Sequence, residues 1–470
     1  MGVLFHVKHR AVGQRAHSFS LLSRRAKPII SLTPPLTEED TVKANRLFLL
    51  TLSLFPVSVF SFVGCASEGK IVNAAPSQLT LTADKLFVVT GGTIRLLGHA
   101  TDTDGDSLTY SWKASGASGP AGSFDPSATG AAVSWIAPSQ AGPVTITMTV
   151  TDEIEKVSKK QDVTVCVRFP SPVRESKTIV GGGYVYMITD ALPVRVVEGI
   201  TLTIDPGVTI VVDSEYGGFE TFGRIVAEGK PSQKIRITNN ATSWDKIDLS
   251  GASAEAIFKH AEISGALGGI QADEQATLTL DSCTIYSNVD CGISVLNSSV
   301  ATIHSCKVWD NGTGIYVLNS MVDIRKSSIR YSAANGIEIS ASQSTAQVVI
   351  EDCEIANHNL DCIVLKEKAF PSIHHNSIYS SGEIQDGGKY YAIRLLGGYS
   401  AADSVEAESN FWGIGNNTEA KIGSVIFDQN DSPAVGAYVR FSPWLENRPI
   451  QQGLTSERRA RGRAWERLWR

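Results

Sequence analysis

A repeat of about 22–26 residues runs through the second half of the chain and limits its possible folds more than any other feature. A small residue followed by isoleucine recurs with spacings of 23, 22 and 22 residues, and then twice more after longer insertions. A second pattern lies between these pairs and reads apolar, two variable residues, small, one variable residue, apolar. The first pattern begins at Gly269, Gly292, Gly314, Gly336, Cys362 and Ala392, and the second at Leu280, Ile303, Ile324, Ile350 and Ile373.

Both patterns have period two, which is the period of a β-strand and not of an α-helix. One copy is too short to bury its apolar face, so successive copies must stack and share a core. We therefore predict an all-β chain with a right-handed parallel β-helix over residues 175–445, whose coils lie about 4.8 Å apart. Polar residues after the second pattern mark turns that need a left-handed backbone, at Asn288, Asn311, Ser332 and Asn357. The small residues of the second pattern form an inward column, Cys283, Cys306, Ser327, Cys353 and Asn376, in which cysteine acts as a small hydrophobic residue.

The flanks of the repeat resemble the ends of bacterial parallel β-helix repeat proteins. Residues 196–212 are similar to their opening coils, and Asn410-Phe411-Trp412-Gly413 resembles the Asn-x-Trp-Gly signature near their carboxy-terminal end. The resemblance implies a pectin-lyase-like fold. That fold hosts lyases, hydrolases, epimerases, phage tailspikes and adhesins, so it does not by itself define a reaction.

Residues 76–168 contain short period-two runs separated by Gly, Pro, Asp and Ser, which predicts an immunoglobulin-like β-sandwich. Residues 65–75 are the expected linker before it. The segment 100–112, which ends in Tyr110-Ser111-Trp112, resembles the PKD and cadherin-like domains of bacterial surface proteins. The resemblance implies a spacer or adhesive module in which Trp112 packs between the two sheets.

Three aspartates alternate within this segment, at Asp102, Asp104 and Asp106, and could present carboxylate oxygens to calcium. The spacing is not that of an EF-hand, because Lys113 stands where the twelfth-position glutamate would be. The alternative is a polar turn whose aspartates bind backbone N–H groups. Calcium is the only cofactor that the sequence suggests.

The amino-terminal part of the chain, residues 1–64, has the pattern of an export signal. Lys43 and Arg46 precede an apolar run that ends at Gly64, and Cys65 follows directly. This segment resembles a lipoprotein signal in which Cys65 is lipidated, with translation expected to begin near Val42 and an ordinary signal peptide or uncleaved anchor as the alternatives. Ala66 then favours an outer-membrane or cell-surface location over inner-membrane retention.

Charge is distributed unevenly along the chain. Residues 65–455 hold 28 basic and 43 acidic residues, a net charge of −15, whereas the tail at 446–470 is rich in arginine and has no predicted role. An acidic body argues against nucleic acid as a partner and disfavours polyanions unless calcium bridges them.

Two outward columns of the predicted β-helix carry candidate site residues. The first contains Arg325, Lys326 and Glu351, which suit a bound uronate or acid–base chemistry on a sugar chain. The alternative is a solvated edge in which opposite charges on neighbouring coils pair. The second contains Tyr316, which could stack on a sugar ring, and Glu338 and Arg394, which could bind hydroxyl groups.

The sequence therefore favours a lipid-anchored surface protein that binds a polysaccharide or a cell-envelope protein without catalysis. The Asn-Thr-Asp, Gly-His-Gly and Arg-Ile-Lys motifs of polygalacturonases do not occur in the chain. The alternative is a polysaccharide lyase or glycoside hydrolase with the pectin-lyase-like fold, which rests on the fold alone.

Overall fold

The computed structural model describes residues 73–116, 119, 121–240, 242–342, 346–379 and 390–449. The predicted signal segment, Cys65, the start of the linker and the tail from residue 450 lie outside the described residues. Within the described ranges, no helix combines the length and apolar character that crossing a membrane requires.

The first eight strands form two mainly antiparallel sheets around one core, and both Trp112 and Trp135 are buried in it. One sheet has the order β1-β3-β6-β5, and β4, β7 and β8 form the other, with β2 paired to β8. Their bounds are β1 (Ser77–Ala83), β2 (Phe87–Val89), β3 (Thr93–Thr101), β4 (Thr109–Gly116), β5 (Ser123–Asp125), β6 (Ala132–Ile136), β7 (Gly142–Thr151) and β8 (Lys156–Arg168).

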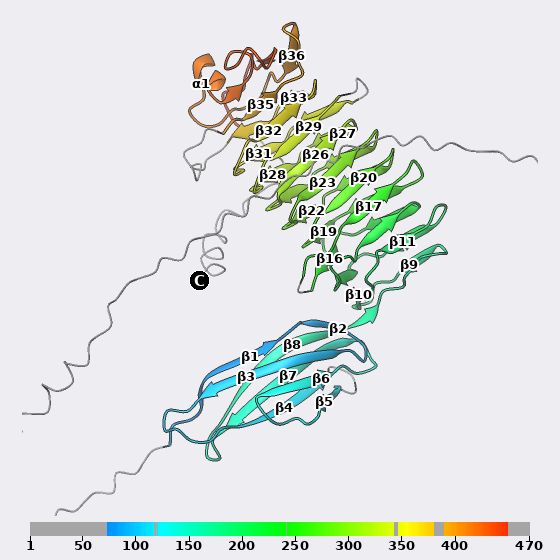
Figure 1. Ribbon diagram of the computed structural model, residues 1–470, viewed down its shortest axis with the longest axis vertical. Helices are drawn as coiled ribbons and strands as arrows, with labels where there is room; N and C mark the ends of the chain where they lie inside the picture. The colour runs from blue at the N-terminus through cyan, green and yellow to red at the C-terminus, as the bar shows by residue number, and fades with distance from the viewer. Residues whose placement is uncertain are drawn as a thin grey trace, which may run out of the picture. The chain divides into compact units, whose positions relative to one another are not determined.

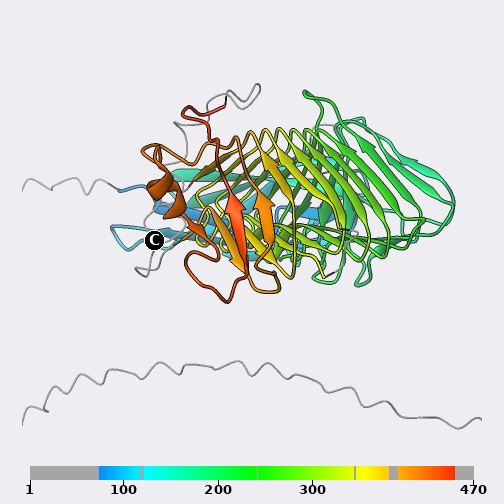
Figure 2. The same ribbon diagram turned by 90° about the horizontal axis from the view of Figure 1, so that it is seen from above.

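The remaining strands coil into three parallel sheets, and each full coil adds one strand to each sheet (Figures 1 and 2). Sheet I consists of β11 (Val194–Val196), β14 (Phe219–Thr221), β17 (Ile247–Ser250), β20 (Ile270–Asp273), β23 (Cys291–Leu296), β26 (Thr313–Leu318), β29 (Ile337–Ser340), β32 (Ile363–Lys366), β35 (Ile393–Leu396) and β37 (Ile426–Phe427).

Sheet II follows sheet I along each coil, and sheet III follows sheet II. Sheet II consists of β9 (Lys177–Ile179), β12 (Thr201–Ile204), β15 (Arg224–Glu228), β18 (Glu255–Lys259), β21 (Thr277–Asp281), β24 (Val300–His304), β27 (Met321–Arg325), β30 (Val348–Glu351), β33 (Ser372–His374), β36 (Asp403–Glu406) and β38 (Ala437–Arg440). Sheet III consists of β10 (Val185–Ile188), β13 (Thr209–Val212), β16 (Ile235–Asn239), β19 (Ala261–Ser264), β22 (Thr284–Tyr286), β25 (Lys307–Trp309), β28 (Ser328–Arg330), β31 (Glu354–Ala356) and β34 (Ser377–Tyr379).

One continuous hydrophobic core fills the coils. Isoleucines of the first repeat pattern stack on the inner side of sheet I. Ile293, Ile315 and Ile337, for example, are register partners on neighbouring strands. The one helix of the described residues, α1 (Glu419–Gly423), begins after the N-cap Thr418 and adds the buried Ile422 to the carboxy-terminal end of this core. The predicted parallel β-helix is therefore confirmed.

A buried column of side chains lines the corner between sheets II and III, as the second repeat pattern predicts. Each column residue follows a residue with positive φ, such as Lys326 (φ 50°) before Ser327 and His375 (φ 57°) before Asn376. The serine and asparagines of the column accept hydrogen bonds from backbone N–H groups of the preceding coil, for example Cys353 N to Asn376 Oδ1 at 2.8 Å, whereas the cysteine thiols donate to backbone carbonyls. Its members are Cys283, Cys306, Ser327, Cys353, Asn376 and Asn410, and no disulfide joins the cysteines of the described ranges.

A second buried column lies at the corner between sheets III and I, and here part of the turn prediction is wrong. The left-handed residues are Ser287, Asp310 and Tyr331, one position before the expected Asn288, Asn311 and Ser332, and only Asn357 is itself left-handed. The residues that follow the left-handed position point inward, because there they satisfy buried backbone groups of neighbouring coils. The column is Asn288, Asn311, Ser332 and His358.

Candidate functional site

The six outward residues predicted for ligand contact do not form one site. Tyr316, Glu338 and Arg394 lie on sheet I, in strands β26, β29 and β35. Arg325 and Glu351 lie on sheet II, and Lys326 is the left-handed residue at the corner after β27. The structure thus separates the two predicted columns onto two faces of the β-helix.

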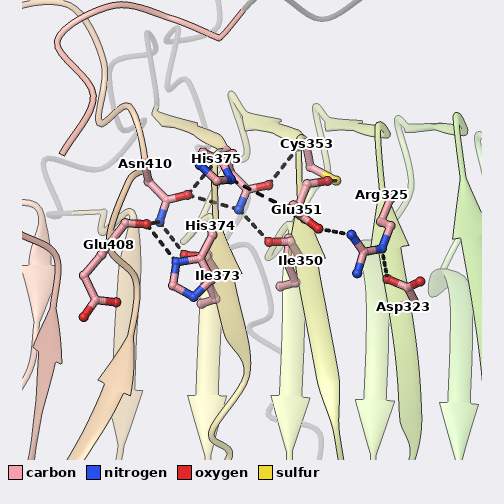
Figure 3. A network of polar contacts seen from close by, with 11 residues as sticks. Asp323, Arg325, Ile350, Glu351, Cys353, Ile373, His374, His375, Glu408 and Asn410 are labelled. Carbon is pink, nitrogen blue, oxygen red and sulfur yellow. Dashed lines mark hydrogen bonds and ion pairs between the residues drawn. The ribbon is translucent and has the colours of Figure 1, made fainter. Parts of the chain in front are cut away.

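The sheet II residues form a row of ion pairs (Figure 3). Arg325 lies between Asp323 on its own strand, 2.7 Å from Nε, and Glu351 on the next coil. The row continues through His304, 3.3 Å from Asp323, and His375, 3.7 Å from Glu351. This arrangement matches the predicted charge-compensated edge, because each carboxylate in the row faces a basic side chain.

Tyr316 and Glu338 are register partners at the centre of the outer face of sheet I. Burial and then the neighbouring Glu338 charge raise the pKa of Tyr316, so its hydroxyl stays protonated at neutral pH. Glu338 forms an ion pair with Lys366 and accepts a hydrogen bond of 2.9 Å from the Asn335 amide. The face therefore presents a phenol beside a carboxylate that is already neutralised.

Arg394 is held in one orientation on the same face. Its Nε lies 3.1 Å from Asp361 Oδ2, and the Asp361 side chain is only 6% exposed. The guanidinium lies 4.7 Å from the ring centre of Tyr391 and 5.7 Å from that of Phe427. Burial raises the pKa of Asp361, while the Tyr391 N–H bond and the Arg394 charge oppose this shift. Arg394 keeps a third of its side chain exposed and can still donate to a ligand.

Sequence reasoning missed the residues that fix this face, namely Asn335, Asp361, Lys366 and Tyr391. A signal for three of them was present, because Asn335, Asp361 and Tyr391 all directly precede a small-isoleucine pair of the repeat. A polar residue directly before a small-isoleucine pair lies at the start of a sheet I strand, and its side chain reaches the outer face of that sheet. Lys366 has no such signal, because it is recognised only through its contact with Glu338.

A third ion-paired carboxylate, Asp248, lies on the same face in β17. Lys246 Nζ is 3.7 Å from its Oδ2, and Gln271 donates to its Oδ1 at 3.2 Å. Burial raises the pKa of Asp248, and Lys246 opposes the rise. The face thus repeats one motif, a buried or largely buried carboxylate held by a basic side chain.

The predicted calcium ligands Asp102, Asp104 and Asp106 come together in one turn. Their nearest carboxylate oxygens all lie within 4.8 Å of one another. The turn also shows the predicted alternative, because Asp102 Oδ1 accepts from the N–H groups of Asp104 (2.9 Å) and Asp106 (3.3 Å). Asp102 Oδ2 is buried without a hydrogen-bond partner, and oxygen donors of this kind suit Ca²⁺.

Comparison with known proteins agrees with this architecture. The family model described as "Right handed beta helix region" matches residues 225–344 and 291–442. No curated protein matches the chain. A crystal structure of a mutant of the periplasmic alginate epimerase AlgG is similar at 12% identity with a TM-score of 0.23, over 56% of this chain and 78% of that one. The family match and the three stacked parallel sheets together identify residues 225–442 as a right-handed parallel β-helix region.

Proposed function

We propose that the protein is exported, is held at the outer membrane or cell surface through a lipid on Cys65, and binds a polysaccharide on the outer face of sheet I without cleaving it. One observation carries the binding proposal. The carboxylates Asp248, Glu338 and Asp361 of this face each form an ion pair with a lysine or arginine of the same sheet.

Ion pairing limits what these carboxylates can do chemically. A general acid or base must exchange a proton with the substrate, and a glycosidase needs two carboxyl groups of which one is protonated. Glu338 and Asp361 are instead already bound to basic side chains, Lys366 and Arg394. Such groups orient donors and accept hydrogen bonds, which is the chemistry of recognition.

The same geometry explains how a sugar chain would bind. Tyr316 offers an aromatic ring and a protonated hydroxyl, and Arg394 offers guanidinium N–H donors that rings of Tyr391 and Phe427 keep in place. Fixed donors lose little conformational entropy on binding, which favours hydroxyl-rich ligands. Tyr316 and Arg394 lie three coils apart in one column of register partners, so an extended polymer suits the face better than a single sugar.

We further propose that the amino-terminal sheets are a PKD-like immunoglobulin-like module that acts as a spacer, with calcium at Asp102, Asp104 and Asp106. The buried oxygen of Asp102 and the mutual approach of the three carboxylates support the calcium site. Bound calcium would supply charge neutralisation in this turn. The sheet I face does not depend on it.

A retention experiment tests the binding proposal. The full chain is passed over immobilised neutral and acidic polysaccharides, with and without calcium, and the eluate is assayed for new reducing and unsaturated ends. We expect retention on at least one polymer, no new ends above a boiled control, and lost retention in Y316A and R394A. R440A is the matched control, because Arg440 lies on sheet II and pairs with Glu406.

Two outcomes would contradict the proposal. New chain ends above the boiled control would show a polysaccharide lyase or hydrolase. Retention on no polymer would leave a cell-envelope protein as the partner, to be sought by crosslinking through Tyr316.

A further inference from the structure

A buried carboxylate stands on the outer face of sheet III. Glu354 is the first residue of β31, and its side chain is 3% exposed although it points away from the helix core. Tyr379 donates its hydroxyl proton to Glu354 Oε1 at 2.6 Å, and Ser328 donates to Oε2 at 3.4 Å. Arg330 Nη2 lies 3.4 Å from Oε1. A charge buried this deeply requires a close cation.

Besides Arg330, a second arginine from a distant part of the chain pairs with Glu354. Arg448 lies beyond the last strand, 94 residues after Glu354, and its Nη2 forms an ion pair with Oε1. The segment that carries it is attached to the final coil by backbone hydrogen bonds, Ser409 N to Pro443 O at 2.6 Å and Leu445 N to Asn410 O at 2.9 Å. Arg448 keeps 40% of its side chain exposed, so solvent reaches it.

The column of side chains beside Glu354 explains why an arginine fits here. Register partners on consecutive coils are Tyr286, Trp309, Arg330, Ala356 and Tyr379. The Tyr286 and Trp309 rings stack in parallel at 4.9 Å. Ala356 is the one short side chain among these five, and it lies two residues after Glu354 on the same strand. The Arg448 guanidinium lies 5.6 Å from the Tyr379 ring centre, and Ala356 is fully buried.

We propose that Glu354 and Tyr379 form a binding site for the protonated amine of an amino sugar, and that Arg448 occupies this site in the free protein. The site supplies a carboxylate for the charge and an aromatic ring for the sugar face. The net charge of −15 over residues 65–455 attracts a cationic polymer and repels an anionic one. Arg448 then acts as a stand-in that the ligand must displace.

The Tyr379 hydroxyl of this site is protonated at neutral pH. Burial, and then the hydrogen bond to Glu354, raise the pKa of Tyr379 to about 12. The phenol therefore remains a donor to Glu354, which also pairs with Arg330 and Arg448. The site lies on sheet III and shares no residue with the sheet I face, so the two proposals can fail independently.

The test is calorimetric titration of the full chain with a glucosamine hexamer, at a pH at which its amines are protonated. We expect R448Q to bind this hexamer about tenfold more tightly than the unsubstituted protein, because no internal cation competes. The double variant E354Q/R448Q should lose that gain. R440A, which removes an exposed arginine paired with Glu406, should bind as the unsubstituted protein does. Circular dichroism melting confirms that each variant is folded.

A second variant covers the case in which R448Q does not fold. R448K keeps a positive charge near Glu354 but lacks the planar guanidinium, so we expect a smaller gain of about threefold.

Three results would overturn the inference. The first is a folded R448Q that binds the glucosamine hexamer no more tightly than the unsubstituted protein. The second is a gain that survives E354Q or appears equally with the neutral N-acetylglucosamine hexamer. The third is equal or tighter binding of hexalysine, which would assign the site to basic peptides.

Discussion

The buried columns at the corners and the ion-pair row of sheet II both repeat once per coil, but they differ in the groups to which their side chains bind. Asn376 accepts from the N–H of Cys353 and donates to the carbonyl of Ile350, and all three groups are buried. Arg325 and Glu351 satisfy each other, and water reaches both side chains. A polar residue therefore stabilises this fold strongly only where it completes the backbone hydrogen bonding of a coil.

The largest expected effect is at Asn376. N376A leaves a buried N–H and a buried carbonyl without partners, and we expect it to lower the free energy of unfolding by about 3 kcal/mol. Urea denaturation followed by circular dichroism measures this loss. N359A is the control, because Asn359 is exposed and only its backbone N–H is bonded, and it should change stability by less than about 0.5 kcal/mol. Equal losses in the two variants would remove the distinction between column and surface.

His358 makes the column between sheets III and I sensitive to acid. Its Nδ1 accepts from Ser332 N at 3.2 Å, and burial lowers the pKa of His358 to about 3. The unfolded chain has a histidine pKa of about 6.5. As pH falls from about 6.5 to 3, the unfolded state binds a proton that the folded state does not. We therefore expect this group to reduce the free energy of unfolding by about 1.4 kcal/mol for each pH unit in that window.

H358N isolates the contribution of this histidine. The asparagine Oδ1 can accept from Ser332 N, as Asn311 Oδ1 accepts from Asn288 N two column positions earlier. Urea midpoints at pH 7 and pH 5 should differ less for H358N than for the unsubstituted protein, by about 2 kcal/mol in the derived free energies. An unchanged pH dependence would show that His358 titrates normally in the folded chain.

The comparison also explains how much the sequence could predict. The fold was predictable because the inward residues recur at a fixed spacing, so Cys353 and Ile355 define the register without any contact information. Three of the four left-handed residues were misplaced by one position, because asparagine is common both in turns and in hydrogen-bonding columns. The outer sites were less accessible. Spacing places Glu338 and Glu354 on outer faces, but the cations that hold them, Lys366 and Arg448, follow from the folded chain alone.

A smaller effect is expected at the buried ion pair of sheet I. In the unsubstituted protein, Tyr391 N donates to Asp361 Oδ1 at 2.7 Å. D361N removes the charge that holds Arg394 but keeps an acceptor for this N–H group. We expect retention on the bound polysaccharide to weaken about tenfold, since Arg394 loses its fixed orientation. E351Q is the matched carboxylate-to-amide change on sheet II. It should leave retention unchanged, and weakened retention in both variants would place the ligand across both faces.

The smallest expected effect is in the sheet II row itself. Arg325 and Glu351 are 38% and 31% exposed, so solvent screens their attraction. We expect R325M to lower the free energy of unfolding by less than about 1 kcal/mol, and the loss to shrink further in about 1 M salt. Urea denaturation at low and high salt measures both quantities. A loss comparable to that of N376A, unchanged by salt, would mean that the row supports the coils as the buried columns do. The repeat would then be stabilised from its outer surface as well as from its corners.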